Sequence, residues 1–155
     1  MTPLELVGKI GAIFDQLGVP WVLGGSVAGS LVGEPRSTLD IDMAVQLDHD
    51  HAEALLAAVG DDFHASADMI RSAVAASRSF NLLHYESAMK VDVFVLGSGL
   101  LDRRQMERRT RVRLSEPPHL ELWATAPDDL VLRKLAWFRL GGEVSDRQWR
   151  DVLGI

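Results

Sequence analysis

The chain has 155 residues, no cysteine and a formal net charge of −6. This length is sufficient for one hydrophobic core, and the lack of cysteine excludes disulfide bonds and thiolate metal sites. The acidic balance argues against a protein that coats nucleic acid non-specifically. No apolar run approaches the roughly 20 residues that span a bilayer, and the N-terminus lacks the residue order of a signal peptide. We therefore expect a cytoplasmic protein with no membrane partner.

Helices and strands are both predicted from hydrophobic periodicity and from capping signals. In chain order they are a helix (3–17), a strand (20–23), a helix (26–31), a strand (39–45), two helices (51–59 and 66–76), two strands (80–85 and 90–96), a short arginine-rich helix, two strands (near 111–114 and 120–123) and two helices (127–140 and from 145). The first helix has the clearest start, because Thr2-Pro3-Leu4-Glu5 combines a capping threonine, an early proline and a glutamate three residues after the cap.

The order of these elements predicts the fold class. Residues 80–85 and 90–96 are separated by a few turn-like residues and are expected to pair as a hairpin. Strands and helices are intermixed along the whole chain. This mixture predicts an α+β fold, in which a mixed β-sheet is flanked by helices and the C-terminus is short and helical.

Two aspartates on one predicted strand are the first candidate site residues. Asp40 and Asp42 are two residues apart, so their side chains leave the same face of the strand, roughly 7 Å apart at the backbone. Two acids on an inner face are costly to desolvate unless a cation lies between them. Mg²⁺ suits this position, because it binds through one or two carboxylates together with substrate phosphates. The alternative is an edge strand with a solvated acidic face.

A glycine-rich turn precedes this pair. Gly24-Gly25-Ser26 lies between an apolar strand and the start of a predicted helix. Glycines at such a turn let the backbone approach a phosphate, the helix start offers free N–H groups, and Ser26 adds a hydroxyl donor. Glycine is common in strand-to-helix turns, so this motif alone is weak. Its combination with an Asp-x-Asp pair after thirteen intervening residues is specific.

Together these motifs resemble those of the DNA-polymerase-beta-like nucleotidyltransferases. The matching segments are Leu23-Gly24-Gly25-Ser26 and Leu39-Asp40-Ile41-Asp42-Met43. Members of this family carry a third carboxylate between apolar residues on a later strand, and Lys90-Val91-Asp92-Val93-Phe94 fits that pattern. The resemblance implies the nucleotidyltransferase fold, with Asp92 facing Asp40 and Asp42 across the sheet. It also implies a catalytic domain over residues 1–125, with C-terminal helices over residues 126–155 packed on it as one compact unit.

The second half of the chain resembles one bacterial subgroup, the nucleotidyltransferase toxins of abortive-infection (type IV) toxin–antitoxin systems and their uncharacterised relatives. The matching motifs are Lys90-x-Asp92, Asp129 followed by Lys134-Leu135, and Arg147-x-x-Arg150-Asp151. Those toxins have a second aspartate three residues beyond this last motif, where this chain has Gly154. The resemblance implies a cognate antitoxin or another partner protein.

The resemblance also implies a reaction, in which a nucleoside monophosphate passes from a nucleoside triphosphate such as ATP to an acceptor hydroxyl and pyrophosphate is released. Two Mg²⁺ or Mn²⁺ ions would be held by Asp40, Asp42 and Asp92, and Asp92 would help to remove the acceptor proton. The acceptor is left open between an RNA such as tRNA, a protein and a small molecule such as an antibiotic. The alternative is a non-catalytic nucleotide-binding or regulatory module of the same fold, against which the three retained carboxylates argue.

The nucleotide phosphates have further candidate ligands. Gly24, Gly25 and Ser26 are expected to hold the terminal phosphates. Lys134 falls within the apolar stripe of helix 127–140, so it either snorkels to solvent or reaches an anionic partner such as the phosphates or the carboxylate cluster. Arg36 precedes the Asp-x-Asp strand and is either a triphosphate contact or a loop arginine.

Other charged and aromatic residues are given structural roles. Asp48-His49-Asp50-His51 is assigned to a helix start, and His84 to a strand. Trp123, Trp137 and Trp149 are assigned to packing and not to base stacking. Six arginines between positions 103 and 113 form either a binding strip for a phosphate-rich ligand or a solvated charged surface.

Overall fold

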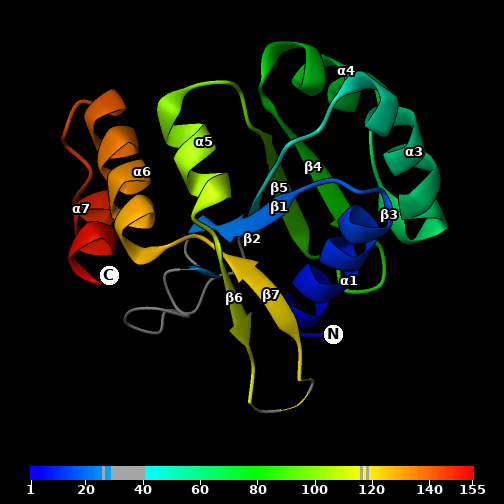
Figure 1. Ribbon diagram of the computed structural model, residues 1–155, viewed down its shortest axis with the longest axis horizontal. Helices are drawn as coiled ribbons and strands as arrows, with labels where there is room; N and C mark the ends of the chain where they lie inside the picture. The colour runs from blue at the N-terminus through cyan, green and yellow to red at the C-terminus, as the bar shows by residue number, and fades with distance from the viewer. Residues whose placement is uncertain (26, 29–40, 116, 118) are drawn as a thin grey trace.

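Figure 1 shows a computed structural model of the chain, which describes residues 1–25, 27–28, 41–115, 117 and 119–155. Three predicted site residues, Ser26, Arg36 and Asp40, lie outside the described residues, as does most of the predicted helix 26–31. The described elements are α1 (Pro3–Gln16), β1 (Trp21–Gly24), β2 (Ile41–Val45), α3 (His49–Val59), β3 (Phe63–His64), α4 (Ala67–Ala76), β4 (Ser79–His84), β5 (Lys90–Val95), α5 (Leu100–Glu107), β6 (Thr110–Arg113), β7 (Glu121–Ala124), α6 (Pro127–Leu140) and α7 (Asp146–Leu153), with a single 3₁₀ turn at Gly60–Asp62.

The helix starts follow the predicted capping signals. Glu5 donates its backbone N–H to the Thr2 hydroxyl at 3.2 Å, and the Glu5 carboxylate accepts from the Thr2 backbone at 2.6 Å, which confirms the capping box. The side chains of Asp48, Ser66 and Ser145 each accept one backbone N–H at the start of α3, α4 and α7. Each such cap contributes about 1 kcal/mol to helix stability. Outside the segments that are not described, the predicted bounds agree with the structure to within two residues.

The strands form a mixed sheet, as predicted. In the described part of the chain it has seven strands in the order β3-β4-β5-β2-β1-β7-β6. The predicted β4–β5 hairpin is antiparallel, whereas β2 pairs with β5 in parallel and with β1 in antiparallel fashion. Strand β3 was not predicted, because its two residues are too few to show an alternating pattern.

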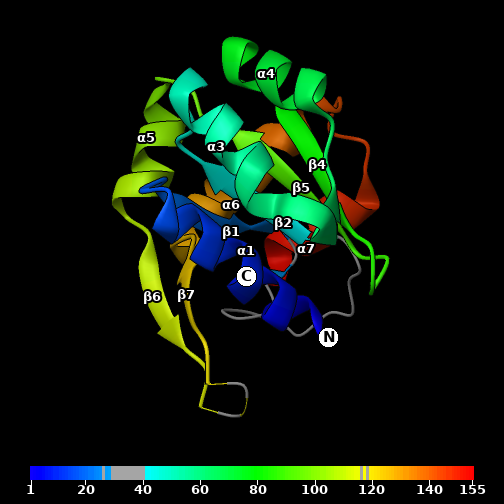
Figure 2. The same ribbon diagram turned by 90° about the vertical axis from the view of Figure 1, so that its right-hand side faces the viewer.

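One face of the sheet carries the main core. Side chains of β1, β2 and β5, such as Leu23, Met43 and Val93, are fully buried there against α1, α3 and α4. Burial of a side chain of this size contributes roughly 1.5–3 kcal/mol, so this face accounts for most of the stability of the fold. Figures 1 and 2 show these three helices together on one side of the sheet.

The opposite face is only partly covered. Helices α5, α6 and α7 lie on that side (Figure 1), and a small second cluster forms where Met106 of α5 packs on Val22 and Ala44, with Phe94 and Leu96 at its edge. Because strand side chains alternate, the residues next to Ala44 and Phe94 on this face are Asp42 and Asp92. Within the described residues, no helix has the length and apolar character needed to cross a bilayer.

Candidate active site

A row of residues across three strands forms the base of the site. Gly24 of β1 is in register with Asp42 of β2, and Asp42 is in register with Asp92 of β5. Residues in register on neighbouring strands are about 4.8 Å apart at the backbone and point to the same face. The structure therefore brings Asp42 and Asp92 together as the motifs predict.

Gly25 lies directly against the Asp42 carboxylate. Its φ is +62°, and a Cβ added to it would lie 1.9 Å from an Asp42 carboxylate oxygen. Both the backbone conformation and the contact therefore require glycine. Gly24 differs, because a Cβ there would meet nothing nearer than the Gln105 amide nitrogen at 3.6 Å. The second glycine of the motif is thus the one that lets the chain turn over the carboxylate.

We expect Gly25→Ala to destabilise the protein by about 2 kcal/mol or more and to remove activity at this site. A left-handed conformation costs an alanine roughly 1–2 kcal/mol, and the new methyl group must also displace Asp42. Gly18→Ala is a matched control, because Gly18 has a φ of +68° but no atom within 4 Å of the added Cβ. Urea unfolding of both variants measures the difference. Equal losses in the two variants would show that the contact with Asp42 is unimportant.

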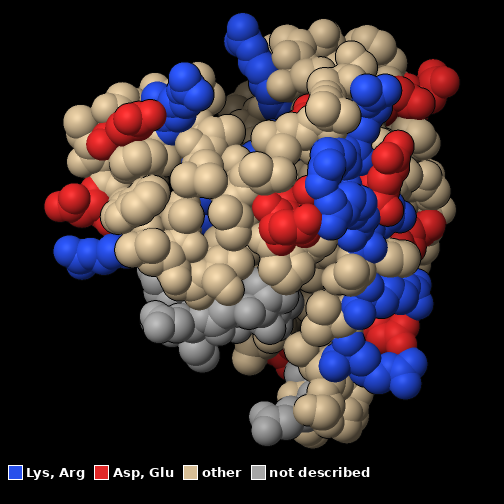
Figure 3. All heavy atoms as spheres, turned by 60° about the vertical axis from the view of Figure 1, so that its left-hand side comes forward, with Lys and Arg blue, Asp and Glu red and all other residues tan. Residues whose placement is uncertain are grey.

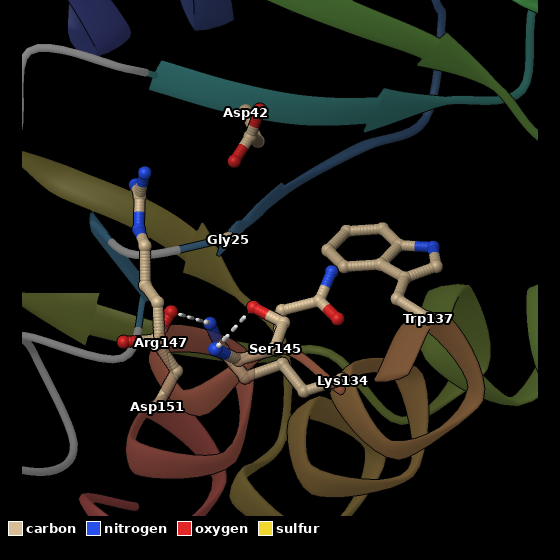
Figure 4. Close-up of a pocket in the computed structure, with 8 residues that line it drawn as sticks. Gly25, Asp42, Lys134, Trp137, Ser145, Arg147 and Asp151 are labelled. Carbon is tan, nitrogen blue, oxygen red and sulfur yellow. Dashed lines mark hydrogen bonds and ion pairs between the residues drawn. The ribbon is translucent and has the colours of Figure 1, made fainter. Parts of the chain in front are cut away.

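A cleft of about 290 Å³ opens beside this row, between the sheet and the two C-terminal helices. Figure 4 shows Asp42 pointing into it from β2, and Lys134 and Trp137 reaching it from α6. The remaining lining residues are Gly25, Ser145, Arg147, Gln148 and Asp151. The Arg147 side chain extends from α7 toward the sheet (Figure 4). The cleft thus combines one carboxylate of the row with two cationic side chains.

Lys134 is buried in this cleft, with only 7% of its surface exposed. Its ammonium lies 3.8 Å from the Asp151 carboxylate of α7. A buried cation is costly without an anionic partner, and Asp151 supplies one. The sequence predicted either snorkelling or an anionic partner, and the structure supplies the partner. It is an acid of α7.

Asp92 also has a cationic neighbour. The Lys90 ammonium lies 2.9 Å from an Asp92 carboxylate oxygen, and Lys90 is about half exposed. Both residues are on β5, two positions apart, so they share one face. The ion pair offsets part of the repulsion that Asp92 exerts on Asp42.

The residues present fit a hard divalent cation. Asp42 and Asp92 supply carboxylate oxygens from adjacent strands, and Gly25 has no side chain that would occupy the space beside the Asp42 carboxylate. No group of three acids or histidines is close enough to form a complete metal site within residues 1–25, 27–28, 41–115, 117 and 119–155. The third predicted ligand, Asp40, is outside those ranges.

Comparison with known proteins supports one fold. No protein-family model and no curated protein matches the chain. Among solved structures, the lincosamide antibiotic adenylyltransferase LnuA, bound to lincomycin, matches 99% of this chain and 96% of its own, with a TM-score of 0.62 and 13% identity. A nucleotidyltransferase-like protein of Paracoccidioides brasiliensis matches 97% of this chain and 73% of its own, with a TM-score of 0.64 and 18% identity. The enzyme ANT(2")-Ia, in complex with adenylyl-2"-tobramycin, matches 98% and 88%, with a TM-score of 0.57 and 16% identity.

The chain has the nucleotidyltransferase fold. This confirms the fold class that the Gly-Gly-Ser, Asp-x-Asp and Asp92 motifs predict. The narrower resemblance to the abortive-infection toxins stays a prediction, as does a cognate antitoxin.

Sequence reasoning missed part of what lines this cleft. Trp137 was assigned to packing alone, but it both stacks at 6.2 Å on Phe94 and lines the cleft. A signal was available, because Trp137 lies three residues after Lys134 and therefore on the same side of α6. Ser145 was predicted only as a helix cap, and its position at the cleft depends on how α7 folds back on α6.

The arginine strip is mostly engaged in structural pairs. Arg104 and Arg108 contact the buried Asp129 of α6. Arg111 and Arg113 both bind Glu121, and the hydrogen bond from Arg113, followed by its charge, lowers the pKa of Glu121. Arg109 stacks on Trp123 at 4.4 Å. Figure 3 shows the resulting mixture of blue and red groups. The described contacts favour a charged structural surface over a phosphate-binding strip.

The other structural assignments are confirmed. Asp48 caps α3 and contacts His51 at 2.8 Å. His84 is buried and its Nδ1 bonds to the Ser87 hydroxyl at 2.9 Å. Trp149 packs against Phe138 at 5.5 Å.

Proposed function

We propose that the chain transfers a nucleoside monophosphate from a nucleoside triphosphate to the hydroxyl group of an acceptor. The observation that carries this proposal is the alignment of Asp42 and Asp92 on the open face of a nucleotidyltransferase fold, with the Gly25 turn against the Asp42 carboxylate. Similar structures include a lincosamide antibiotic adenylyltransferase and a complex with adenylyl-2"-tobramycin, which supports the reaction type.

In the proposed reaction the acceptor oxygen bonds to the α-phosphorus while the bond from this phosphorus to the bridging oxygen of the β-phosphate breaks. Pyrophosphate leaves with that oxygen, and the acceptor proton passes to a carboxylate, for which Asp92 is our candidate. Residues 1–125 carry the carboxylates and residues 126–155 supply cations of the cleft, so both proposed parts contribute. The main task of the protein is to hold the reacting groups in line.

Asp42, Asp92 and the predicted third ligand Asp40 would hold the divalent cations. Two Mg²⁺ or Mn²⁺ ions, when bound, supply positive charge next to the phosphate oxygens and the attacking hydroxyl. The backbone at Gly24 and Gly25 would contact the terminal phosphates, together with Ser26 and Arg36 in our proposal. Lys134 would contribute a compact positive charge from the cleft, held in place by Asp151.

We expect Lys134→Met to weaken nucleoside triphosphate binding by about tenfold or more, since a hydrogen bond to a charged group contributes about 1.5–3 kcal/mol. The free energy of unfolding should change by only about 1 kcal/mol, because methionine has a smaller desolvation cost than lysine and the Asp151 carboxylate, which is 18% exposed, remains in contact with water. Calorimetric titration and urea unfolding measure the two effects. Lys9→Met is the control. Lys9 also forms an ion pair with an aspartate distant in sequence, Asp62, and neither of these two residues lines the cleft. A large stability loss with unchanged affinity would assign Lys134 to a structural ion pair alone.

The function itself is tested by label transfer. The protein is incubated with Mg²⁺ or Mn²⁺ and each nucleoside triphosphate, labelled at either the α- or the γ-phosphate. Total RNA, cell protein and hydroxyl-rich antibiotics are offered as acceptors. Transfer from the α-labelled substrate alone supports the proposal, and transfer from the γ-labelled substrate would indicate a kinase. Nucleotide binding without any transfer would favour the alternative of a non-catalytic module.

A further inference from the structure

A second, apolar pocket opens on the same face of the sheet. It has a volume of about 80 Å³, and its floor is formed by Ala44 of β2 with Phe94 and Leu96 at the end of β5. Ala44 and Phe94 are in register with each other, two positions along their strands from the Asp42–Asp92 pair. The pocket floor is therefore one row, or about 7 Å, from the carboxylates on the same face.

The wall of the pocket carries an aromatic ring and two polar side chains. Trp137 of α6 lies beside Phe94, and Arg133 and Gln105 also line the pocket. A lining that is mainly apolar, with a few fixed polar groups, is typical of small-molecule sites. Because such sites usually enclose about 300–1,000 Å³, a pocket of about 80 Å³ suits one part of a larger ligand.

The polar groups are held in place by a chain of hydrogen bonds. Arg133 donates to the side-chain amide oxygen of Gln105 at 2.8 Å and to the Asp102 carboxylate at 2.6 Å. The Gln105 amide donates to the Thr125 hydroxyl at 3.0 Å, and Thr125 donates to the Leu23 carbonyl at 2.9 Å. These bonds connect α6 and α5 to the strand that leads into Gly24. Side chains that are fixed in this way can discriminate between ligands by hydrogen bonding.

The apolar pocket and the larger cleft meet at the carboxylate row. Gly25, Asp42 and Trp137 line both of them. Lys134 and Arg147 line only the larger cleft, so that side suits the negatively charged phosphates. If the α-phosphate lies at Asp42, the nucleoside extends from it in a direction other than that of the β- and γ-phosphates. The apolar pocket opens at the same carboxylate and is lined by aromatic rings.

We propose that this apolar pocket binds the nucleobase of the nucleoside triphosphate. The base stacks on Trp137 beside Phe94, while Arg133 and Gln105 contact its polar edge and select among bases. A planar aromatic ligand matches this lining, because its faces are apolar and its edge carries hydrogen-bonding groups. This inference rests on the proposed function, since it assumes that the α-phosphate lies at Asp42.

Filling the pocket provides the test. Ala44→Leu adds three carbon atoms to the pocket floor without removing any group that is proposed to bind metal or phosphate. Ala58→Leu, on the exposed side of α3, is the matched control. Affinities for Mg²⁺-loaded ATP, GTP, CTP and UTP, and for Mg²⁺-loaded inorganic triphosphate, are measured by calorimetry. Inorganic triphosphate has no base, so its binding reports on the carboxylates and the larger cleft alone.

We expect Ala44→Leu to weaken the best-bound nucleoside triphosphate by about tenfold or more, while the affinity for inorganic triphosphate changes less than about twofold. Trp137→Leu should likewise weaken nucleoside triphosphate binding and leave inorganic triphosphate binding nearly unchanged, and Trp137→Phe should recover part of the lost nucleotide affinity. These two variants provide the test if Ala44→Leu does not fold. Ala58→Leu should bind both ligands as the unchanged protein does.

Two outcomes would overturn the inference. Unchanged nucleotide affinity in Ala44→Leu, with or without lower transfer to an acceptor, would assign the pocket to another ligand. Equal losses for nucleotide and inorganic triphosphate would show that the substitution acts through the carboxylate row. The proposed function can be wrong independently of this inference. If Ala44→Leu selectively lost nucleotide binding but the unchanged protein had no transfer activity, the base pocket would be supported and the proposed enzymatic function would be wrong.

Discussion

Asp92→Asn is expected to lower nucleotidyl transfer at least about a hundredfold while the melting temperature changes by no more than about 2 °C. Asparagine has the same shape but no negative charge, so a cation at this position loses a charged ligand. Replacing a residue that only hydrogen-bonds to a metal ligand already costs about 10- to 100-fold in activity, and loss of the ligand itself should cost at least as much. The side chain is on the open face of the sheet and 21% exposed, so its replacement leaves the main core untouched. The ion pair with Lys90 is also lost, but a partly exposed pair contributes only about 0–1 kcal/mol.

The prediction is measured by α-label transfer and by thermal unfolding of the same preparation. Asp68→Asn serves as the control, because Asp68 is a fully exposed acid on α4 whose nearest cation is Arg71 at 3.7 Å. It should retain full activity. If Asp92→Asn transferred nucleotide at nearly the rate of the unchanged protein, the assignment of the third carboxylate would be wrong.

The parts of the fold that could be predicted are those determined by nearby residues. Helix α1 begins at a capping box that lies within four consecutive residues, and α6 spans the predicted residues 127–140. In β2 the alternation of apolar and polar residues shows which side chains share a face. These signals are local, and in natural sequences local preferences usually agree with the overall fold, so they can be identified without knowing the tertiary contacts.

Contacts between distant segments could not be predicted in the same way. The register of Asp42 against Asp92 depends on hydrogen bonds between strands that are 50 residues apart, and the family resemblance supplied it where periodicity could not. The pairing of Lys134 with Asp151 depends on α7 folding back along α6. For Arg104 and Arg108 the sequence shows a run of like charge, whereas the structure places Asp129 of another helix against them.

The two faces of strand β2 have different environments, and this difference positions the site residues. On β2, Ile41, Met43 and Val45 are buried in the main core, and this fixes the direction of the residues between them. A shift of the register by one residue would bury Asp42 in that core, at a cost of several kcal/mol for an unpaired charge. The hydrophobic pattern therefore directs Asp42 and Ala44 to the same open face, which is why the carboxylate row and the apolar pocket are neighbours.

The last prediction concerns metal binding and requires no knowledge of the acceptor. Asp42 and Asp92 are held side by side by the register of their strands, and Asp40 is predicted to join them. Mg²⁺ or Mn²⁺ should bind this arrangement in the folded protein and not in the unfolded chain. At a metal concentration of about 100 times Kd, the stabilisation is about 2.7 kcal/mol. For a chain of this size, that free energy raises the melting temperature by about 5 °C or more.

Asp42→Asn separates this site from a solvated acidic surface. The substitution relieves the repulsion between neighbouring carboxylates, so the metal-free melting temperature should rise, and it removes a ligand, so most of the metal-dependent gain should disappear. Scanning calorimetry with MgCl₂ or MnCl₂, against NaCl at matched ionic strength, measures both effects. Asp68→Asn should keep the full metal response. An acidic surface without a specific site predicts a small response that Asp42→Asn and Asp68→Asn share, because screening acts on both acids alike. A melting temperature that is indifferent to metal in the unchanged protein, or a response that survives Asp42→Asn, would exclude the proposed metal site.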